Sequence, residues 1–269
     1  MRRIGMVSLI GAGPGDPDLL TVKALKRIQN AEVVVYDRLV SQDIMDLVPP
    51  KTALYPVGKK PRSHPIPQEE INQLLVDLAK EGKRVARLKG GDPFIFGRGS
   101  EEAAELVKAG VSYEVIPGIT AAQGCASSLN LPLTHRGLAT GLRYVTGHCQ
   151  KDVPLDLDWA SLADPNTTLV IYMGLAAIEE ISAKLIEHGM PADMPAAAIS
   201  KGTTSEERKV FGTLTTIGEQ AKNANLPAPC LFMIGDVVGL KQALQVPAAF
   251  SGAKGDWADK RPHLEVING

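Results

Sequence analysis

Aromatic residues are scarce in this chain of 269 residues, in which phenylalanine, tryptophan and tyrosine together make up 4%. A surface that stacks nucleic-acid bases is therefore not expected, because such surfaces are built from aromatic side chains. Net charge is nearly absent as well, since 29 lysines and arginines stand against 30 aspartates and glutamates. This balance gives no general attraction to nucleic acid or to a membrane, so an anionic ligand has to meet a local basic cluster.

Cysteines are also few, and the three present, Cys125, Cys149 and Cys230, are far apart in the sequence. An odd number at long spacings argues against a disulfide framework and against a zinc site. The five histidines share no ligand spacing, so no metal is expected. The short apolar run near the start is broken by Gly11 and Pro14, which predicts neither a signal peptide nor a membrane span. We therefore expect a cytoplasmic protein.

Strand-like and helix-like segments alternate through the first part of the chain. Strands are expected at 6–10, 32–37, 53–57, 84–88 and 113–116. Alternation of this kind is typical of a parallel sheet covered by helices. The chain is also close to the length at which one core divides into two. The expected organisation is an N-terminal α/β domain at 1–117, a C-terminal α/β domain at 118–245 and a loose tail at 246–269.

The second part contains a new set of strand-like segments. They are expected at 142–146, 168–174, 196–200 and 230–235, and the segments 208–211 and 213–216 are predicted to pair as a hairpin around Gly212.

The segment Gly11–Asp18 follows the first strand and has part of a dinucleotide-binding pattern. In that pattern an acid that binds the ribose follows the glycines by roughly 20 residues, and Asp37 lies at about this distance. However, Asp16 occupies the position of the third glycine, and Pro14 and Pro17 remove N–H donors that a pyrophosphate needs. The pattern is broken, and its glycines predict a tight turn against an uncharged or cationic group. A nicotinamide-dependent oxidoreductase remains the alternative from a different class.

The glycine-rich segment Lys89–Glu102 lies between a predicted strand and a predicted helix, where parallel α/β proteins bind ligands. Gly97 and Gly99 flank Arg98 and predict a backbone that is left open for the close approach of a ligand. Asp92 is predicted either to accept a hydrogen bond from a ribose hydroxyl or an ammonium group, or to cap its own turn.

Two sets of residues suggest two ligands. Small residues gather at five strand ends: Gly11–Gly15, Gly90–Asp92, Thr120-Ala121, Met173-Gly174 and Gly202-Thr203. Together they suit a folded adenosyl group, which needs backbone contacts at close range. The basic set is Lys59, Lys60, Arg62, Arg98, Arg136 and Arg143. If these side chains converge, they suit a polycarboxylate, because arginine binds carboxylates through two parallel hydrogen bonds.

These segments together resemble the S-adenosylmethionine-dependent tetrapyrrole methylases, and among them the uroporphyrinogen-III C-methyltransferases. The resemblance extends from about residue 6 to 240. It rests on Gly11–Thr21, Tyr36–Val40, Gly90–Pro93, Phe96–Gly99, Pro117–Ala122, Pro132–Arg136 and Tyr172–Gly174. It implies a homodimer whose chain has an N-terminal parallel five-stranded sheet and a C-terminal mixed five-stranded sheet, with the active site in the cleft between the two α/β domains.

The resemblance further implies S-adenosyl-L-methionine as methyl donor, S-adenosyl-L-homocysteine as product, and no metal. The residues that match the donor site of the family are Pro14, Gly90, Gly91, Asp92, Ile95, Thr120, Ala121, Met173 and Gly202. The reaction implied is methylation of uroporphyrinogen III at C2 and C7, giving precorrin-2 through precorrin-1, for sirohaem, cobalamin or haem d1 synthesis.

For the acceptor, the resemblance implies Asp37 as proton acceptor and Lys59 as proton donor. Arg98, Glu101 and Arg136 match positions that face the substrate. Arg98 keeps two interpretations, a carboxylate clamp or part of the proton-handling group, and the permanent charge of arginine favours the clamp. Asp37 has the alternative role of orienting the basic loop. The alternative functions are a later corrinoid methylase, a diphthine synthase and a non-catalytic tetrapyrrole-binding protein.

Overall fold

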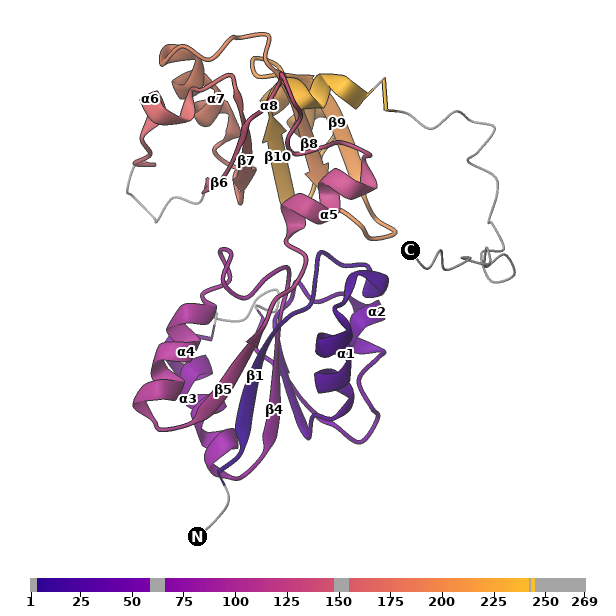
Figure 1. Cartoon of the computed structure of the whole chain (residues 1–269), viewed down its shortest axis with the longest axis vertical. Helices are drawn as coiled ribbons and strands as arrows, with labels where there is room; N and C mark the ends of the chain where they lie inside the picture. Colours follow the sequence, from indigo (N-terminus) through magenta and orange to yellow (C-terminus); the bar gives the residue numbers. More distant parts are fainter. Residues whose placement is uncertain (1–3, 59–65, 148–154, 242, 245–269) are drawn as a thin grey trace, which may run out of the picture.

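The computed structural model describes residues 4–58, 66–147, 155–241 and 243–244, which form two α/β units, one above the other (Figure 1). The strands of the first unit are β1 (Met6–Gly11), β2 (Val33–Tyr36), β3 (Ala53–Pro56), β4 (Arg84–Lys89) and β5 (Ser112–Ile116). Its helices are η1 (Pro17–Leu19), α1 (Val22–Gln29), α2 (Gln42–Met45), α3 (Gln68–Lys80) and α4 (Gly99–Lys108). The five predicted strands are confirmed with small shifts at their ends.

The first sheet is parallel throughout, in the order β3-β2-β4-β1-β5. The chain moves from β1 to β2 and β3 in one direction and then returns to β4 and β5 in the other. Because such crossovers are right-handed, the reversal places α1 and α2 on one face and α3 and α4 on the other. The reversal also leaves the carboxyl ends of β1 and β4 side by side, which is where open parallel sheets bind ligands.

The second unit is built on a mixed sheet in the order β6-β7-β10-β8-β9. Only β6 and β7 run parallel, and the other neighbours are antiparallel. Its strands are β6 (Gly141–Thr146), β7 (Thr167–Tyr172), β8 (Pro195–Ser200), β9 (Arg208–Thr213) and β10 (Cys230–Ile234). Its helices are α5 (Ala121–Ser128), α6 (Trp159–Leu162), α7 (Ile178–Glu187), α8 (Ile217–Asn223) and η2 (Asp236–Lys241). The predicted combination of a parallel and a mixed five-stranded sheet is therefore confirmed.

The predicted hairpin around Gly212 is wrong. Residues 208–213 form the single strand β9, in which Gly212 pairs with Ala196 of β8. A Cβ atom on Gly212 would lie 2.3 Å from the side-chain oxygen of Gln220 in α8. The glycine therefore lets α8 pack closely on the strand, and it makes no turn.

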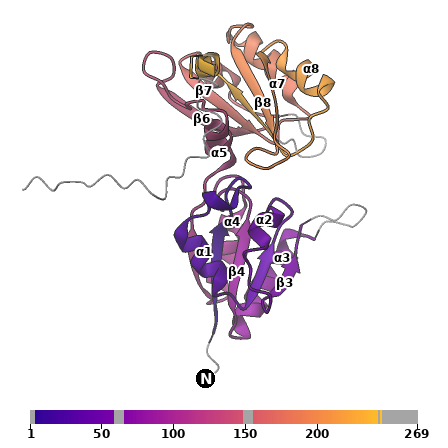
Figure 2. The same cartoon turned by 90° about the vertical axis from the view of Figure 1, so that its right-hand side faces the viewer.

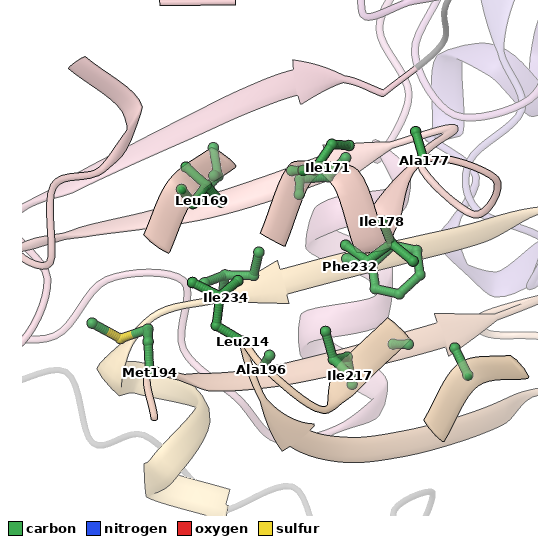
Figure 3. Packing of buried hydrophobic residues seen from close by; sticks show 14 of the residues in the cluster. Leu169, Ile171, Ala177, Ile178, Met194, Ala196, Leu214, Ile217, Phe232 and Ile234 are labelled. Carbon is green, nitrogen blue, oxygen red and sulfur yellow. The ribbon is translucent and has the colours of Figure 1, made fainter. Parts of the chain in front are cut away.

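Each face of the second sheet is covered by helices. On one face, α6, α7 and α8 enclose a cluster that includes Leu169, Ile171, Ile178, Ile217 and Phe232, all almost fully buried (Figure 3). On the other face α5 packs through Ala122, Cys125 and Ala126. Apolar burial on both faces is the main stabilising contribution for a sheet of this kind. None of the helices in the described part of the chain has both the length and the apolar character needed to cross a membrane.

Helix α5 stands at the junction of the two units, as both views show (Figures 1 and 2). The loop after β1 also crosses this junction, because the N–H of Asp16 donates to the hydroxyl of Thr203 at 3.3 Å. The junction therefore brings strand ends of both sheets to one place. The tail expected at 246–269 lies outside the described residues.

Candidate active site

The loops that follow β1 and β4 are joined through their main chains, and the side chain of Asp92 joins them to the loop after β5. Gly13 and Gly91 exchange two hydrogen bonds, of 3.1 and 2.7 Å. Asp92 accepts from the N–H of Gly118 through Oδ2 at 3.0 Å and from the N–H of Phe94 through Oδ1 at 2.8 Å. Asp92 thus caps its own turn, the second of the two roles predicted for it, and ties the ends of β4 and β5 together.

The glycines that flank Arg98 pack against the protein itself. A Cβ atom would lie 2.7 Å from the carbonyl oxygen of Pro93 if placed on Gly97, and 2.5 Å from it if placed on Gly99. The prediction that these two glycines leave the backbone open to a ligand is therefore wrong, because the main chain of the same loop fills that space.

Gly91 differs from these glycines because a Cβ atom there would meet no clash, whereas its backbone conformation is unusual. Its φ is +69°, and the atoms nearest to a hypothetical Cβ are 3.8 Å away, on Thr120 and Ala121. Glycine adopts this left-handed conformation without steric cost. Gly91 therefore packs against the main chain at the start of α5.

Helix α5 also contacts two more of the residues expected to bind the donor. A Cβ atom on Gly124 would lie 2.4 Å from Cγ of Pro14, and one on Gly202 would lie 2.3 Å from Sγ of Cys125. Burial raises the pKa of the Cys125 thiol to about 12, so this sulfur packs as a neutral group. Segments from both units thus meet on this one helix.

The chemistry of the expected donor residues fits a sulfonium ligand. These residues are Pro14, Gly90, Gly91, Asp92, Ile95, Thr120, Ala121, Met173 and Gly202, and none of them is basic. A nearby lysine or arginine would repel the positive sulfur atom, whereas a neutral or acidic surface does not. Met173 is half exposed and has a φ of +55°. This backbone conformation is unfavourable for methionine, so contacts with the surrounding structure must maintain it.

Tyr172 joins the two units beside this position. Its hydroxyl lies 2.6 Å from Oγ1 of Thr120 and accepts from the N–H of Ala122 at 3.0 Å. Its ring centroid is 5.0 Å from that of Phe96 and 5.7 Å from that of Tyr144. Burial raises the pKa of Tyr172, so the hydroxyl stays neutral. The sequence offered one signal for this residue, a tyrosine at the carboxyl end of a strand in a chain poor in aromatics.

Arg98 and Glu101, both expected to face the substrate, form one ion pair. Nε of Arg98 is 2.8 Å from Oε1 of Glu101, Nη2 is 2.7 Å from Oε2, and about half of each side chain is exposed. The hydrogen bonds raise the pKa of Arg98 and lower the pKa of Glu101. Both groups are therefore charged at neutral pH, and the guanidinium is held by Glu101 through two of its nitrogens.

The other basic residues do not all join this pair. Arg136 is exposed on a separate loop, between α5 and β6, and Arg143 donates to the carbonyl and the hydroxyl of Ser161. The condition that all six basic residues converge is therefore not met for Arg143, whose Nη1 is engaged by Ser161. Lys59, Lys60 and Arg62 lie outside the described residues.

Asp37, the expected proton acceptor, lies directly after β2. Its Oδ1 accepts from the N–H of Leu39 at 3.0 Å, and its Oδ2 is 4.0 Å from Nη2 of Arg87. Arg87 is almost fully buried in the central strand β4. The carboxylate of Asp37 therefore lies beside the buried guanidinium of Arg87.

A buried ion cluster below the glycine-rich loop was not predicted from the sequence. Glu102 accepts from Nε of Arg87 at 3.0 Å and from Nζ of Lys89 at 2.9 Å through the same oxygen, Oε1. Burial lowers the pKa of Lys89, the charge of Arg87 lowers it further, and Glu102 opposes both. Oε2 of Glu102 has no hydrogen-bond partner among the described residues. The alternation of Arg87 and Lys89 on a central strand, which places both on one face, was the available signal.

A surface depression of about 560 Å³ lies elsewhere, beside β9, and Lys209, Phe211, Gln220 and Lys241 are among its lining residues. The ammonium group of Lys241 is 3.4 Å from the centre of the Phe211 ring, which partners this cation within the protein. The depression contains none of the residues expected to bind donor or substrate. In the described ranges, no group of three or more His, Cys, Asp and Glu residues is placed to hold a metal ion.

The fold and the junction can now be compared with known proteins. The family model of the Tetrapyrrole (Corrin/Porphyrin) Methylases matches residues 6–218, so the chain belongs to this family. Within it, the chain is 55% identical over 244 residues to the uroporphyrinogen-III C-methyltransferase of Paracoccus denitrificans, with 91% of this chain and 85% of that protein covered. It is 52% identical over 240 residues to the siroheme synthase of Methylobacillus flagellatus, with 89% of this chain covered. The chain spans about half the length of that synthase, 51%.

Among solved structures, the chain is similar to the uroporphyrin-III-C-methyltransferase of Thermus thermophilus. The identity is 41% and the TM-score 0.75, with 92% of this chain and 98% of that chain covered. The Thermus protein has also been crystallised in complex with S-adenyl homocysteine, at 39% identity to this chain and a TM-score of 0.75, with 88% of this chain and 100% of that chain covered.

Proposed function

We propose that this chain transfers methyl groups from S-adenosylmethionine to C2 and C7 of uroporphyrinogen III, giving precorrin-2 through precorrin-1. The observation that carries the proposal is the 55% identity to the Paracoccus enzyme across 91% of the chain. The complex of the Thermus enzyme with S-adenyl homocysteine supports S-adenosylmethionine as donor and S-adenosylhomocysteine as product.

The donor is proposed to bind at the junction, around the start of α5. The main chain of Gly90, Gly91, Thr120 and Ala121 would meet the adenosyl group, and the absence of basic side chains among the nine expected residues suits the sulfonium. S-adenosylmethionine supplies a methyl group that is already activated. The protein therefore has to align donor and acceptor, and alignment alone can supply a large part of the rate enhancement.

The acceptor is proposed to bind beside the donor, across the exposed side chains near the junction. Phe94, Phe96 and Met173 are large apolar residues with roughly half of their surface exposed, and they would contact the macrocycle. Uroporphyrinogen III also carries eight carboxylates. Arg98 is proposed to clamp one of them while Glu101 holds the guanidinium in place, and Arg136 is proposed to bind another.

In the proposed reaction, the electron-rich pyrrole carbon attacks the methyl carbon as the bond from carbon to sulfur breaks. The electron pair of that bond stays on sulfur, and the alkylated macrocycle then loses one proton. Asp37, whose Oδ2 lies 4.0 Å from Nη2 of Arg87, is proposed to accept the proton. Lys59, the proposed proton donor, lies outside the described residues. The two methyl transfers use the same site in turn.

The proposal includes a homodimer of two-domain chains in the cytoplasm, with residues 1–117 and 118–245 as the domains and the site in the cleft between them. The pair of separate sheets and the set of expected residues at their junction support the two domains and the position of the site. The homodimer and the cytoplasmic location come from the family resemblance. Size-exclusion chromatography with light scattering measures the oligomeric state directly.

The decisive experiment is incubation of the purified chain with uroporphyrinogen III and S-adenosylmethionine, followed by mass spectrometry. A mass gain of two methyl groups is expected. No gain would reject the proposed substrate and favour a later corrinoid methylase or a diphthine synthase. Thermal shift with S-adenosylhomocysteine and with NAD tests the oxidoreductase alternative, which requires stabilisation by NAD alone.

A further inference from the structure

We propose that Tyr172 is a positioning residue that aligns the methyl donor with the acceptor. Its hydroxyl caps helix α5 on the donor side, and its ring supports the loop that carries Arg98 on the acceptor side. The identity of the two ligands rests on the proposed function above, whereas the contacts of Tyr172 do not.

The first observation is that α5 is capped by a residue from another element. Thr120 occupies the N-cap position with extended backbone angles, but its side chain makes no cap hydrogen bond. An N-cap threonine usually accepts from the second or third N–H of its helix. Here the second N–H, that of Ala122, donates to the hydroxyl of Tyr172 at 3.0 Å. The hydroxyl of Thr120 is itself bonded to Tyr172 at 2.6 Å.

The consequence is that Tyr172 determines where the start of α5 lies. Tyr172 is the last residue of β7 in the second sheet, whereas Thr120 and Ala121 lie just after the first sheet. These two residues and Met173, which directly follows Tyr172, are expected donor contacts. A shift of the tyrosine would therefore displace both sides of the donor site at once.

The second observation is the contact of the Tyr172 ring with Phe96, 5.0 Å between centroids and tilted by 50°. Tilted aromatic pairs at this distance are attractive. Phe96 has a φ of +51°, uncommon for a bulky residue, so the loop depends on such contacts for its shape. Arg98 follows two residues later. The ring of Tyr172 thus supports the loop between its anchor at Asp92 and the arginine proposed to clamp the acceptor.

Two variants separate the two halves of the proposal. Tyr172→Phe keeps the ring and removes the hydroxyl that caps α5, whereas Phe96→Leu keeps the hydroxyl and removes the ring partner. Tyr113→Phe, an exposed tyrosine of β5, is the matched control. For each, we would measure the dissociation constant of S-adenosylhomocysteine by calorimetry, kcat and KM with uroporphyrinogen III, and the ratio of one-methyl to two-methyl product. Circular dichroism would set a temperature at which every variant is folded.

Tyr172→Phe is expected to weaken S-adenosylhomocysteine binding about fivefold, the usual scale for a lost cap or hydrogen bond, and to leave the KM of the acceptor within about twofold. Phe96→Leu is expected to leave S-adenosylhomocysteine binding within about twofold while kcat falls and one-methyl product accumulates. A purely structural role would lower the melting temperature of Tyr172→Phe and leave both binding and product ratio unchanged.

Unchanged S-adenosylhomocysteine binding by folded Tyr172→Phe would overturn the inference. So would an equal effect of the two variants on donor binding. If the unsubstituted chain does not methylate uroporphyrinogen III, the proposed function fails, but the loss of donor binding in Tyr172→Phe still tests the cap. The two failures are therefore distinguishable.

Discussion

The buried carboxylate of Glu102 accepts a hydrogen bond from the ammonium group of Lys89 at 2.9 Å, and this contact closes the loop between them. Lys89 is the last residue of β4, and Glu102 lies in the first turn of α4. Some of the residues proposed to contact donor and acceptor, those from Gly90 to Glu101, lie between these two ends. The ion cluster thus holds together the end of β4 and the start of α4, between which this loop runs.

Glu102→Gln is expected to lower the free energy of unfolding by about 3 kcal/mol, because it removes the buried carboxylate that is hydrogen-bonded to both Arg87 and Lys89. Urea denaturation followed by circular dichroism measures this. Glu105→Gln is the matched control, since Glu105 forms an exposed ion pair with Lys108 in the same helix, and a change below about 1 kcal/mol is expected. Equal losses in the two variants would contradict the role given to the buried cluster.

Arg98→Ala is expected to retain binding of S-adenosylhomocysteine within about twofold and to reduce turnover of uroporphyrinogen III at least tenfold, because a charge-assisted contact to the acceptor is lost. Calorimetry and steady-state kinetics measure the two effects. Arg84→Ala removes an exposed arginine from the opposite end of β4, where it pairs with Glu32, and no change is expected. Loss of donor binding in Arg98→Ala, with acceptor binding kept, would reverse the assignment of the loop.

Gly202→Ala is expected to weaken S-adenosylhomocysteine binding and to lower the melting temperature, because its Cβ would lie 2.3 Å from Sγ of Cys125. Cys125→Ala alone removes that sulfur and leaves a small cavity. The double variant is expected to recover stability relative to Gly202→Ala, since the two substitutions compensate in volume. Differential scanning calorimetry of the four proteins completes a double-mutant cycle. Additive losses would show that the contact does not explain the glycine.

Stability at low pH is expected to depend on Glu114, which bridges β5 to α1 and to Ser8 of β1. Burial raises the pKa of this carboxyl, but hydrogen bonds from Arg27, Lys23 and Ser8 lower it more, to about 2. Because the pKa of Glu114 is lower in the folded state, about 2, than the ordinary value of 4.5, its ionised carboxylate stabilises the fold above a pH of about 4.5. This stabilisation is lost as the pH falls toward about 2.

Glu114→Gln is therefore expected to cost about 1–2 kcal/mol at pH 7, and the difference from the unsubstituted chain should shrink below pH of about 4.5. Urea titrations at a series of pH values measure it. A difference that stays constant down to pH of about 3 would contradict the linkage, and Glu105→Gln serves again as the exposed control.

The architecture was predictable from the sequence because the apolar segments and the turn residues between them indicate the same strands and helices. Apolar runs such as Val33–Tyr36 and Thr167–Tyr172 are bounded by polar or turn residues, which is enough to place buried strands. Gly212 was misassigned because a glycine inside a strand pattern looks like a turn. In the structure a Cβ atom there would meet the side chains of Thr216 and Gln220, and no local pattern reveals these contacts.

The site was predictable in part, for a related reason. Motifs identified the loops but not what their residues contact within the protein. Thus Gly97 and Gly99 are glycines because the carbonyl of Pro93 fills the space beside them, and Asp92 holds two main-chain N–H groups. The Tyr172 cap and the pairing of Lys89 with Glu102 depend on which elements meet in three dimensions, and sequence spacing does not encode this.

The main-chain contacts among the strand ends also have a consequence for engineering. Gly13 and Gly91 hold each other through backbone atoms, and Gly11 and Gly118 approach so closely that a Cβ on either would collide with the other. These contacts do not involve the side chains at positions 94, 98 and 101. Randomising those three positions, with Asp92 and Phe96 kept, would therefore diversify the proposed acceptor surface while the main-chain contacts around the proposed donor site stay the same.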